Sequence, residues 1–182
     1  MSDFWVFGYG SLMWRPGFEY VAVTPARLGG VHRALCIYSW VHRGTRAHPG
    51  LVLGLDRGGS CRGIAYRVAG EKRESVMAYL RERELVTDVY REVRRPMALL
   101  DGSTQIVEAV TYVADRGHEQ YAGRLPRERL LEIVATAEGR LGRNDEYIIN
   151  TARHLREAGA RDEILDWLAA ELGGEGGSEG RR

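Results

Sequence analysis

The sequence predicts an α+β fold in which an antiparallel or mixed sheet, built largely from hairpins, is followed by a group of helices. Short apolar and β-branched stretches dominate the first part of the chain, one strong helical pattern lies between two predicted hairpins, and the last third is helical in periodicity. A doubly wound parallel sheet would instead require strands and helices to alternate. With 182 residues, of which 44% are hydrophobic, the chain is long enough for one domain, which we expect to cover residues 1–172.

The first strand is predicted at residues 4–7, an aromatic and β-branched run that ends at Gly8. A proline and a further glycine follow soon afterwards, so a long helix should not begin directly after this turn. Two short strands are expected next, at residues 19–28 and 31–40, where apolar stretches of strand type recur. The start of the sheet is therefore predicted as a series of short strands.

Two hairpins are predicted further along the chain. Residues 51–55 and 64–68 flank a loop of turn-forming residues, which contains Asp56, Gly58, Gly59 and Ser60. Residues 94–100 and 105–113 are expected to form the second hairpin, with Asp101-Gly102 at its turn.

One helix is predicted between the hairpins, over about residues 71–85, and further helices fill the last third of the chain. The apolar positions of these later helices are Leu130, Leu131 and Val134, then Tyr147, Thr151 and Leu155, and finally Ile164, Leu165, Leu168 and Leu172. Asn144-Asp145-Glu146 is typical of a helix start. Residues 173–182, rich in glycine and charge, are expected to form a disordered tail.

The charge balance argues against a nucleic-acid partner. The chain carries 26 basic and 25 acidic residues, whereas nucleic-acid binders normally have a basic surplus. Lys72 is the one lysine among the basic residues, and we attribute the excess of arginine to genome composition. No apolar run approaches the length of about 18 residues that a membrane span needs, and no secretory pattern opens the chain, so we expect a cytoplasmic protein without a membrane partner.

The cysteine and histidine patterns predict neither a disulfide framework nor a metal site. Cys36 and Cys61 lie in apolar segments and are expected to be inert core residues. The five histidines show no spacing typical of metal ligands, so we expect no metal.

The first strand is followed by a glycine-rich turn, Gly8-Tyr9-Gly10-Ser11-Leu12-Met13. It lacks the third glycine of a dinucleotide fingerprint, the ending of a phosphate-binding P-loop and the flanking glycines of a nucleophile elbow. Two glycines at a strand end nevertheless allow backbone N–H groups to converge into a concave anion site, with the Ser11 hydroxyl as a further donor. An ordinary tight turn is the alternative.

One acidic side chain stands on the apolar face of the helix predicted between the hairpins. Glu84 follows Met77 and Leu80 at helical spacing, so it should point toward the core or a pocket. Burial of a carboxylate is costly unless the group is paired or protonated, and it raises the pKa toward the range of a general base. The alternative is a frayed helix end, where Glu84 pairs with an arginine such as Arg81 or Arg91.

Five segments, in this order along the chain, form a recognisable combination. The first is Val6-Phe7-Gly8-Tyr9-Gly10-Ser11-Leu12-Met13-Trp14. The others are His42-Arg43-Gly44 with Pro49-Gly50, Gly63-Ile64-Ala65-Tyr66-Arg67, Tyr79-Leu80 with Arg83-Glu84 and Tyr90-Arg91, and Gly142-Arg143-Asn144 with Glu146-Tyr147. Together they resemble the ChaC family of γ-glutamylcyclotransferases, over roughly residues 4–170.

The resemblance implies a γ-glutamylcyclotransferase-like fold, which is a mixed, partly closed β-barrel with surrounding helices, and an enzyme without a metal or organic cofactor. It implies cleavage of the γ-glutamyl bond of glutathione, a small-molecule substrate, to give 5-oxoproline and cysteinylglycine. The family's catalytic glutamate corresponds to Glu84. Its substrate loop corresponds to Val6, Phe7, Gly8, Tyr9, Gly10, Ser11 and Leu12. Leu85-Val86-Thr87-Asp88 replaces the Gly-Gly often found after the family's Arg-Glu pair, a change that bears on substrate preference.

In the implied reaction the substrate's own α-amine attacks its γ-carbonyl, so the protein need not supply a nucleophile. Glu84 is expected to be the general base, and the turn would bind the glutamyl carboxylate or the γ-carbonyl. Tyr121 is a weaker candidate for hydrogen bonding to the substrate, with a structural role as its alternative. Tyr147 is left out of the site because it equally fits a helix core. Other γ-glutamyl amides or γ-glutamylamines are alternative substrates, and a non-catalytic ligand-binding regulator is the alternative to an enzyme.

Overall fold

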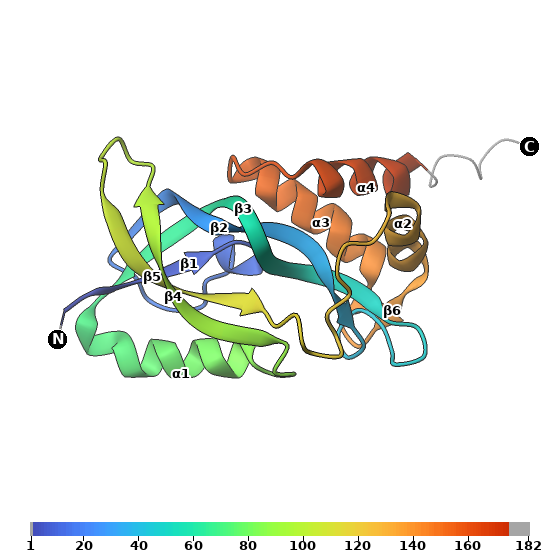
Figure 1. Ribbon diagram of the computed structural model, residues 1–182, viewed down its shortest axis with the longest axis horizontal. Helices are drawn as coiled ribbons and strands as arrows, with labels where there is room; N and C mark the ends of the chain where they lie inside the picture. Colours follow the sequence, from blue (N-terminus) through green and yellow to red (C-terminus); the bar gives the residue numbers. More distant parts are fainter. Residues whose placement is uncertain (1, 175–182) are drawn as a thin grey trace, which may run out of the picture. The chain divides into compact units, whose positions relative to one another are not determined.

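The computed structural model describes residues 2–174, and its main sheet closes into a barrel (Figure 1). The strands follow the order β1–β3–β2–β4–β5 around the barrel. Their bounds are β1 (Phe4–Gly8), β2 (Ala22–Ser39), β3 (Gly50–Val68), β4 (Tyr90–Leu99) and β5 (Ile106–Ala114). The sheet is mixed, because β1 pairs with β5 in parallel and with β3 antiparallel.

The chain divides into two compact units. The first consists of Met1–Ala34 and Gly54–Glu119, and the second of Leu35–Leu53 and Gln120–Arg182. Strands β2 and β3 run through both units, since each begins in one and ends in the other. The single domain expected over residues 1–172 stays a prediction.

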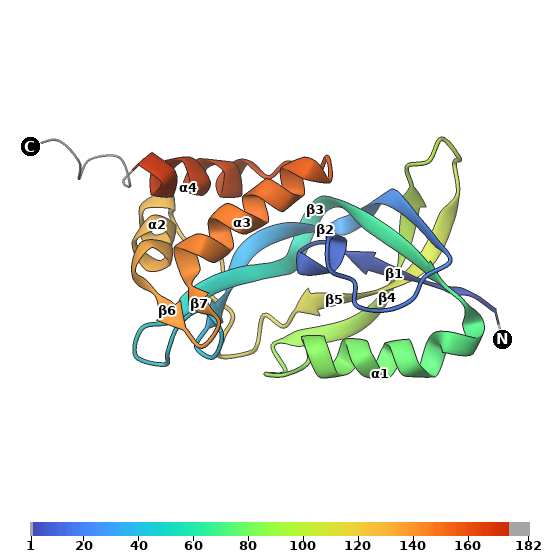
Figure 2. The same ribbon diagram turned by 180° about the vertical axis from the view of Figure 1, so that it is seen from behind.

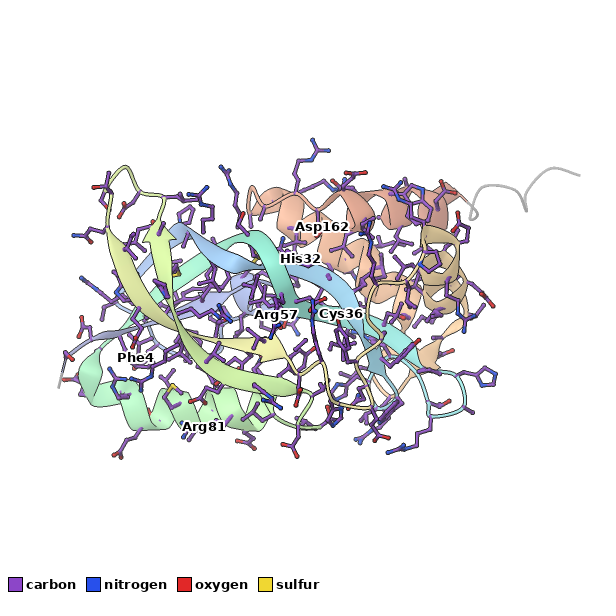
Figure 3. All side chains as sticks on the ribbon, in the orientation of Figure 1. Phe4, His32, Cys36, Arg57, Arg81 and Asp162 are labelled. Atoms are coloured by element: carbon purple, nitrogen blue, oxygen red, sulfur yellow. The ribbon has the colours of Figure 1, made fainter. Side chains whose placement is uncertain are left out.

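Helix α1 (Arg73–Glu84) packs against the barrel within the first unit and confirms the helix predicted over residues 71–85. A short 3-10 turn, η2 (Gly70–Lys72), leads into it. Val76, Met77 and Leu80 form its buried stripe, as the periodicity predicts. They join a core that also contains Phe4, Val6, Leu12, Tyr66, Val68, Val110 and Tyr112. Figure 3 shows the contrast between the faces: Phe4 lies between β1 and the helix, and Arg81 lies on the helix's outer side.

The strand register brings three chain segments to one end of the barrel. Because β1 and β5 are parallel, with Val6 opposite Val110, both strands end on the same side. Strand β4 is antiparallel to β5 and pairs its first residue, Tyr90, with the last residue of β5, so β4 begins on that side. Helix α1 ends at Glu84, shortly before β4 starts. The topology therefore places Glu84 and the turn after Gly8 at the same end of the barrel.

The second unit contains three helices among its described residues: α2 (Arg127–Thr136), α3 (Asn144–Glu157) and α4 (Glu163–Gly174), shown in Figures 1 and 2. They agree with the predicted helical periodicity, and α3 begins at the predicted Asn144. The Asn144 side chain accepts a hydrogen bond from the Leu51 N–H at 2.7 Å and donates one to the Leu51 carbonyl at 2.9 Å. A short hairpin, β6 (Glu138–Gly139) and β7 (Gly142–Arg143), precedes α3.

The predicted disordered tail is described only in part. Gly173 and Gly174 belong to α4, which extends two residues beyond the predicted end of the domain. Residues 175–182 lie outside the described part of the chain.

Two predictions about the sheet are wrong. Residues 19–28 and 31–40 do not form two short strands, because β2 continues through the glycines between them. Residues 51–55 and 64–68 do not form a hairpin, because β3 is one strand of 19 residues. Gly30, Gly58 and Gly59 have φ angles of 77°, 101° and 71°. Glycines with positive φ occur in long strands at bulges as well as in turns, and here they lie within the strands.

The second predicted hairpin is confirmed. Strands β4 and β5 pair antiparallel, and Ser103 N donates to the Asp101 carboxylate at 2.9 Å across the turn. Gly102 adopts a φ of 88°, which matches the Asp-Gly signal in the sequence.

Both cysteines, Cys36 and Cys61, are buried, as expected. Among the described residues, no helix is both long enough and apolar enough to cross a membrane.

Candidate active site

The glycine-rich turn lies at the end of β1. Gly8 ends the strand, and after Gly10 the chain forms a short 3-10 turn, η1 (Ser11–Met13). The turn is closed by hydrogen bonds from Met13 N to the Gly10 carbonyl at 2.9 Å and from Arg15 N to the Ser11 carbonyl at 2.8 Å. The first N–H groups of a helical turn have no partner within it, and here these are the amides of Ser11 and Leu12. That they bind an anion stays a prediction.

A buried tyrosine, Tyr66, is hydrogen-bonded to the backbone of this turn. The Tyr66 hydroxyl, on β3, lies 2.9 Å from the Leu12 carbonyl oxygen and 2.8 Å from the Met13 carbonyl oxygen, to which it donates. Burial, with a smaller contribution from Tyr20, raises the pKa of Tyr66 to about 12. The hydroxyl therefore keeps its proton at neutral pH and remains a donor to the turn.

Two further side chains fix the backbone on either side of Gly8. Arg33, on β2, donates from Nε to the Tyr9 carbonyl at 2.6 Å, and Thr111, on β5, donates from its hydroxyl to the Phe7 carbonyl at 3.2 Å. Thr111 is fully buried, so its hydroxyl needs such a partner. The turn is thus held from β2, β3 and β5.

Glu84 is the last residue of α1, and its side chain is only 17% exposed. It continues the stripe of Met77 and Leu80, as the helical spacing predicts. Burial raises the pKa of the Glu84 carboxyl, and the neighbouring Arg83 cation opposes this increase. The charge of Glu84 also contributes to raising the pKa of Tyr112, a core tyrosine of β5, after burial and Glu92. At a given pH, a carboxylate in these surroundings takes up a proton more readily than an exposed one.

Arg83 connects Glu84 to the glycine-rich turn. Its Nε lies 3.2 Å from Glu84 Oε1, and its Nη2 donates to the Ser11 hydroxyl at 2.8 Å. The Ser11 hydroxyl and the Glu84 carboxylate are therefore bound to two nitrogens of one guanidinium group. This contact agrees with the strand register in bringing the two predicted parts of the site together.

Nη1 of Arg83 makes three further contacts. It donates to the carbonyls of Arg15 at 2.6 Å and Pro16 at 3.2 Å, and lies 3.0 Å from the Tyr79 hydroxyl one helical turn earlier. Arg83 is not among the site residues predicted from the sequence. Its position four residues after Tyr79, beside an inward-facing carboxylate, is the signal that could have found it.

The arginines named as alternative partners of Glu84 pair elsewhere. Arg81 binds Glu92, with Nε 2.8 Å from Oε2, and Arg91 binds Asp115 at 2.6 Å. Glu84 therefore pairs with neither Arg81 nor Arg91. The arginine that it pairs with at the helix end is Arg83.

The predicted substrate-binding residues fall into different parts of the fold. Val6 and Phe7 are fully buried residues of β1, Gly8 ends that strand, and Tyr9 to Leu12 lie in the glycine-rich turn. Tyr121 belongs to the second unit, where it forms an isolated bridge with Ile37. Its role in substrate binding stays a prediction.

Tyr147, left out of the predicted site, also lies in the second unit, and its hydroxyl accepts a hydrogen bond from Leu53 N at 3.2 Å. Within residues 2–174, no group of three or more histidines, cysteines or acidic residues is arranged to hold a metal ion.

Comparison with known proteins gives consistent results. The family model described as ChaC-like protein matches residues 4–173. The glutathione-specific gamma-glutamylcyclotransferase of Escherichia coli (strain K12) is 35% identical over 168 residues, which cover 92% of this chain and 72% of that protein. Glutathione-specific gamma-glutamylcyclotransferase 1 of Homo sapiens is 33% identical over 173 residues, which cover 93% of this chain and 78% of that protein.

A crystal structure of the yeast gamma-glutamyl cyclotransferase specific to glutathione superposes with a TM-score of 0.83. The alignment covers 96% of this chain and 97% of that one, at 21% sequence identity, and shows the shared fold. The expected fold class is therefore confirmed, with the barrel closed rather than partly closed. The match of the family model over nearly the whole chain shows that this protein belongs to the ChaC-like family.

Proposed function

We propose that this protein is a glutathione-specific γ-glutamylcyclotransferase, which releases 5-oxoproline and cysteinylglycine from glutathione. The relatives that carry this name are 30–35% identical to the chain over most of its length. The structural observation that carries the proposal is the largely buried Glu84 carboxylate, linked through Arg83 to Ser11 of the glycine-rich turn.

The reaction is an intramolecular aminolysis. The α-amine of the glutamyl group attacks the γ-carbonyl, a C–N bond closes the five-membered ring, and the C–N bond to the cysteine residue breaks. No water is consumed. The attacking nitrogen changes from an ammonium group to a lactam N–H and loses two protons, and the departing nitrogen changes from an amide N–H to an ammonium group and gains two. Folding the glutamyl chain so that amine and carbonyl meet can contribute up to about 7–11 kcal/mol in well-oriented cases.

Glu84 manages the proton in this scheme. The substrate's α-amine is largely protonated at neutral pH, so a base must remove a proton before attack. The raised pKa of Glu84 brings the carboxylate nearer to the working pH, where proton transfer is most efficient. The protonated Glu84 then gives this proton to the departing nitrogen, and the second proton, which the ring nitrogen loses after attack, is taken up as the amine of cysteinylglycine becomes an ammonium group.

The turn from Gly8 to Leu12 supplies the binding groups. Its amide N–H groups, with the Ser11 hydroxyl, would hold the glutamyl carboxylate or polarise the γ-carbonyl. The hydrogen bonds from Tyr66, Arg33 and Thr111 fix the backbone of this segment, which supports a preorganised site. Preorganised donors require no rearrangement at the moment of reaction.

The products distinguish this reaction from its alternatives. Purified protein incubated with glutathione should yield equal amounts of 5-oxoproline and cysteinylglycine by mass spectrometry. Hydrolysis would give glutamate in place of 5-oxoproline. Intact glutathione after prolonged incubation, with binding detected by calorimetry, would instead support the non-catalytic regulator.

Other γ-glutamyl compounds form the second candidate substrate class. The segment Leu85-Val86-Thr87-Asp88 directly follows Glu84, Val86 is 58% exposed, and Asp88 has a φ of 57°. Bulky side chains in this segment would affect which leaving group, cysteinylglycine or another amine, fits beside Glu84. We expect kcat/KM for glutathione to exceed that for γ-glutamyl-alanine and γ-glutamyl-lysine, and a higher value for either of these would favour the second class.

The proposal includes a cytoplasmic location and a small molecule as the partner. Fractionation of cells that express the protein at its natural level, followed by detection with a specific antibody, tests the location.

A further inference from the structure

Arg83 lies between the glycine-rich turn and Glu84, and its side chain is largely shielded from solvent. Its side chain is 20% exposed, and its contacts reach α1, the glycine-rich turn and the segment that follows the turn. An arginine at a helix end ordinarily extends into water, so this arrangement calls for a specific explanation.

The guanidinium group is nearly saturated by the protein. It has five N–H groups. Nε faces Glu84, Nη1 is engaged by the Arg15 and Pro16 carbonyls and by the Tyr79 hydroxyl, and Nη2 donates to Ser11. Little donor capacity remains for a substrate carboxylate, so Arg83 acts through the residues that it holds.

We propose that Arg83 is a positioning residue that fixes the glycine-rich turn relative to Glu84 and keeps the Glu84 carboxylate ionised between catalytic cycles. This inference rests on the proposed function, because it assigns Glu84 the role of general base. The planar fork of arginine is suited to this task, since it can bind a carboxylate and a hydroxyl on different nitrogens at the same time.

The other groups near Glu84 do not replace Arg83. Tyr112, on β5, is uncharged at neutral pH and lies 3.4 Å from Glu92 Oε2 on β4. Glu92 is paired with Arg81, so the positive charge of Arg81 is already compensated. Tyr66, on β3, is also uncharged at neutral pH. Among residues 2–174, Arg83 is the cation that contacts the Glu84 carboxylate directly.

Substitution of Arg83 by methionine, R83M, separates this role from a merely structural one. Loss of a contacting cation typically raises a carboxyl pKa by about 1–3 units, less where solvent screens the charge. We expect the acid limb of the kcat/KM profile to move up by about one pH unit, which lowers kcat/KM about tenfold at acidic pH and much less at alkaline pH. KM should also rise, because the turn loses its anchor at Ser11.

Two further variants complete the test. R83K retains the charge without the fork, and it should restore the acid limb toward its wild-type position while KM stays raised. R73M is the matched control, because Arg73 lies at the start of the same helix. Its guanidinium carbon lies 4.4 Å from the centroid of the Phe4 ring. R73M should leave the profile unchanged. A uniform fall in kcat/KM at every pH, equal in R83M and R83K, would overturn the inference.

A direct titration keeps the inference testable if the protein does not cleave glutathione. The ¹³C carboxyl shift of Glu84, assigned by its loss in E84Q, reports the pKa of Glu84 without turnover. A higher pKa in R83M than in the wild type and R83K supports the role of Arg83, and an unchanged pKa in R83M contradicts it. Absence of 5-oxoproline with wild-type protein would refute the proposed function alone.

Discussion

Replacement of Tyr66 by phenylalanine removes one hydroxyl and leaves two carbonyls of the glycine-rich turn without their donor. The hydroxyl lies within 2.9 Å of both the Leu12 and Met13 carbonyl oxygens. A lost hydrogen bond costs about 0.5–1.5 kcal/mol, and a buried acceptor left unsatisfied costs about 1–3 kcal/mol. Because one proton serves both carbonyls, we expect the free energy of unfolding to fall by about 1–3 kcal/mol.

The assay combines stability with kinetics. For a chain of this size each kcal/mol corresponds to a melting temperature change of about 2–4 °C. Y66F should melt lower by a corresponding amount and show a higher KM, because the turn is less firmly held. Tyr20 provides the control. Its ring centroid lies 5.0 Å from that of Tyr66, but the residue is 44% exposed, so Y20F should change neither the melting temperature nor KM. An unchanged melting temperature and KM in Y66F would refute the role given to this hydroxyl.

Two further predictions concern packing and pH. Gly63→Ala would place a Cβ 2.3 Å from the Gly8 carbonyl oxygen and 2.7 Å from the Phe7 ring, so we expect a loss of about 1–3 kcal/mol in denaturant unfolding. Gly29→Ala meets nothing within 4 Å, and an equal loss there would contradict this reasoning. Burial raises the pKa of Glu84 in the folded chain above the value near 4.5 of the unfolded chain. The carboxyl group therefore favours the folded state most at a pH below 4.5, and this contribution to stability is lost as the pH rises through the pKa of the folded state. E84Q should therefore melt higher than the wild type near pH 7, and the difference should shrink toward pH 4; a constant difference across this range would show that the carboxyl is not responsible.

The helices were predictable from the sequence because their signals are local. The stripe of Val76, Met77 and Leu80 in α1 has the spacing of one helical face, and the same geometry places Glu84 inward. Asn144 begins α3, where an amide side chain and two acidic residues follow the usual pattern of a helix start.

The long strands were not predictable because their cause is not local. Gly58 and Gly59 read as a turn in isolation, and only the neighbouring strands of the barrel show that β3 continues through them. The pairing of β3 with β1 and its position beside β2 depend on residues far apart in the sequence. Long-range pairing of this kind overrides the local preference for a turn.

Within the candidate site, the sequence identified the inward-facing carboxylate and the glycine-rich turn but not what joins them. Arg83 stands among several arginines of α1. Its spacing of four residues from Tyr79 is a local signal, but this spacing alone does not show that Arg83 contacts Glu84 and the turn while Arg81 pairs with Glu92. The two differ in tertiary contacts, since Arg83 reaches Ser11 and Arg81 reaches Glu92. Positions of this kind depend on the packing of a helix end against a distant turn.

Turnover by E84Q tests the central claim most directly. The amide preserves the shape of the side chain but cannot accept the proton of the α-amine, and general-base catalysis typically contributes about 10²–10⁴ in rate. We predict that folded E84Q releases 5-oxoproline from glutathione at least about 100-fold more slowly than the wild type. Release at a rate within a few-fold of the wild type would contradict the assignment of Glu84 as the general base.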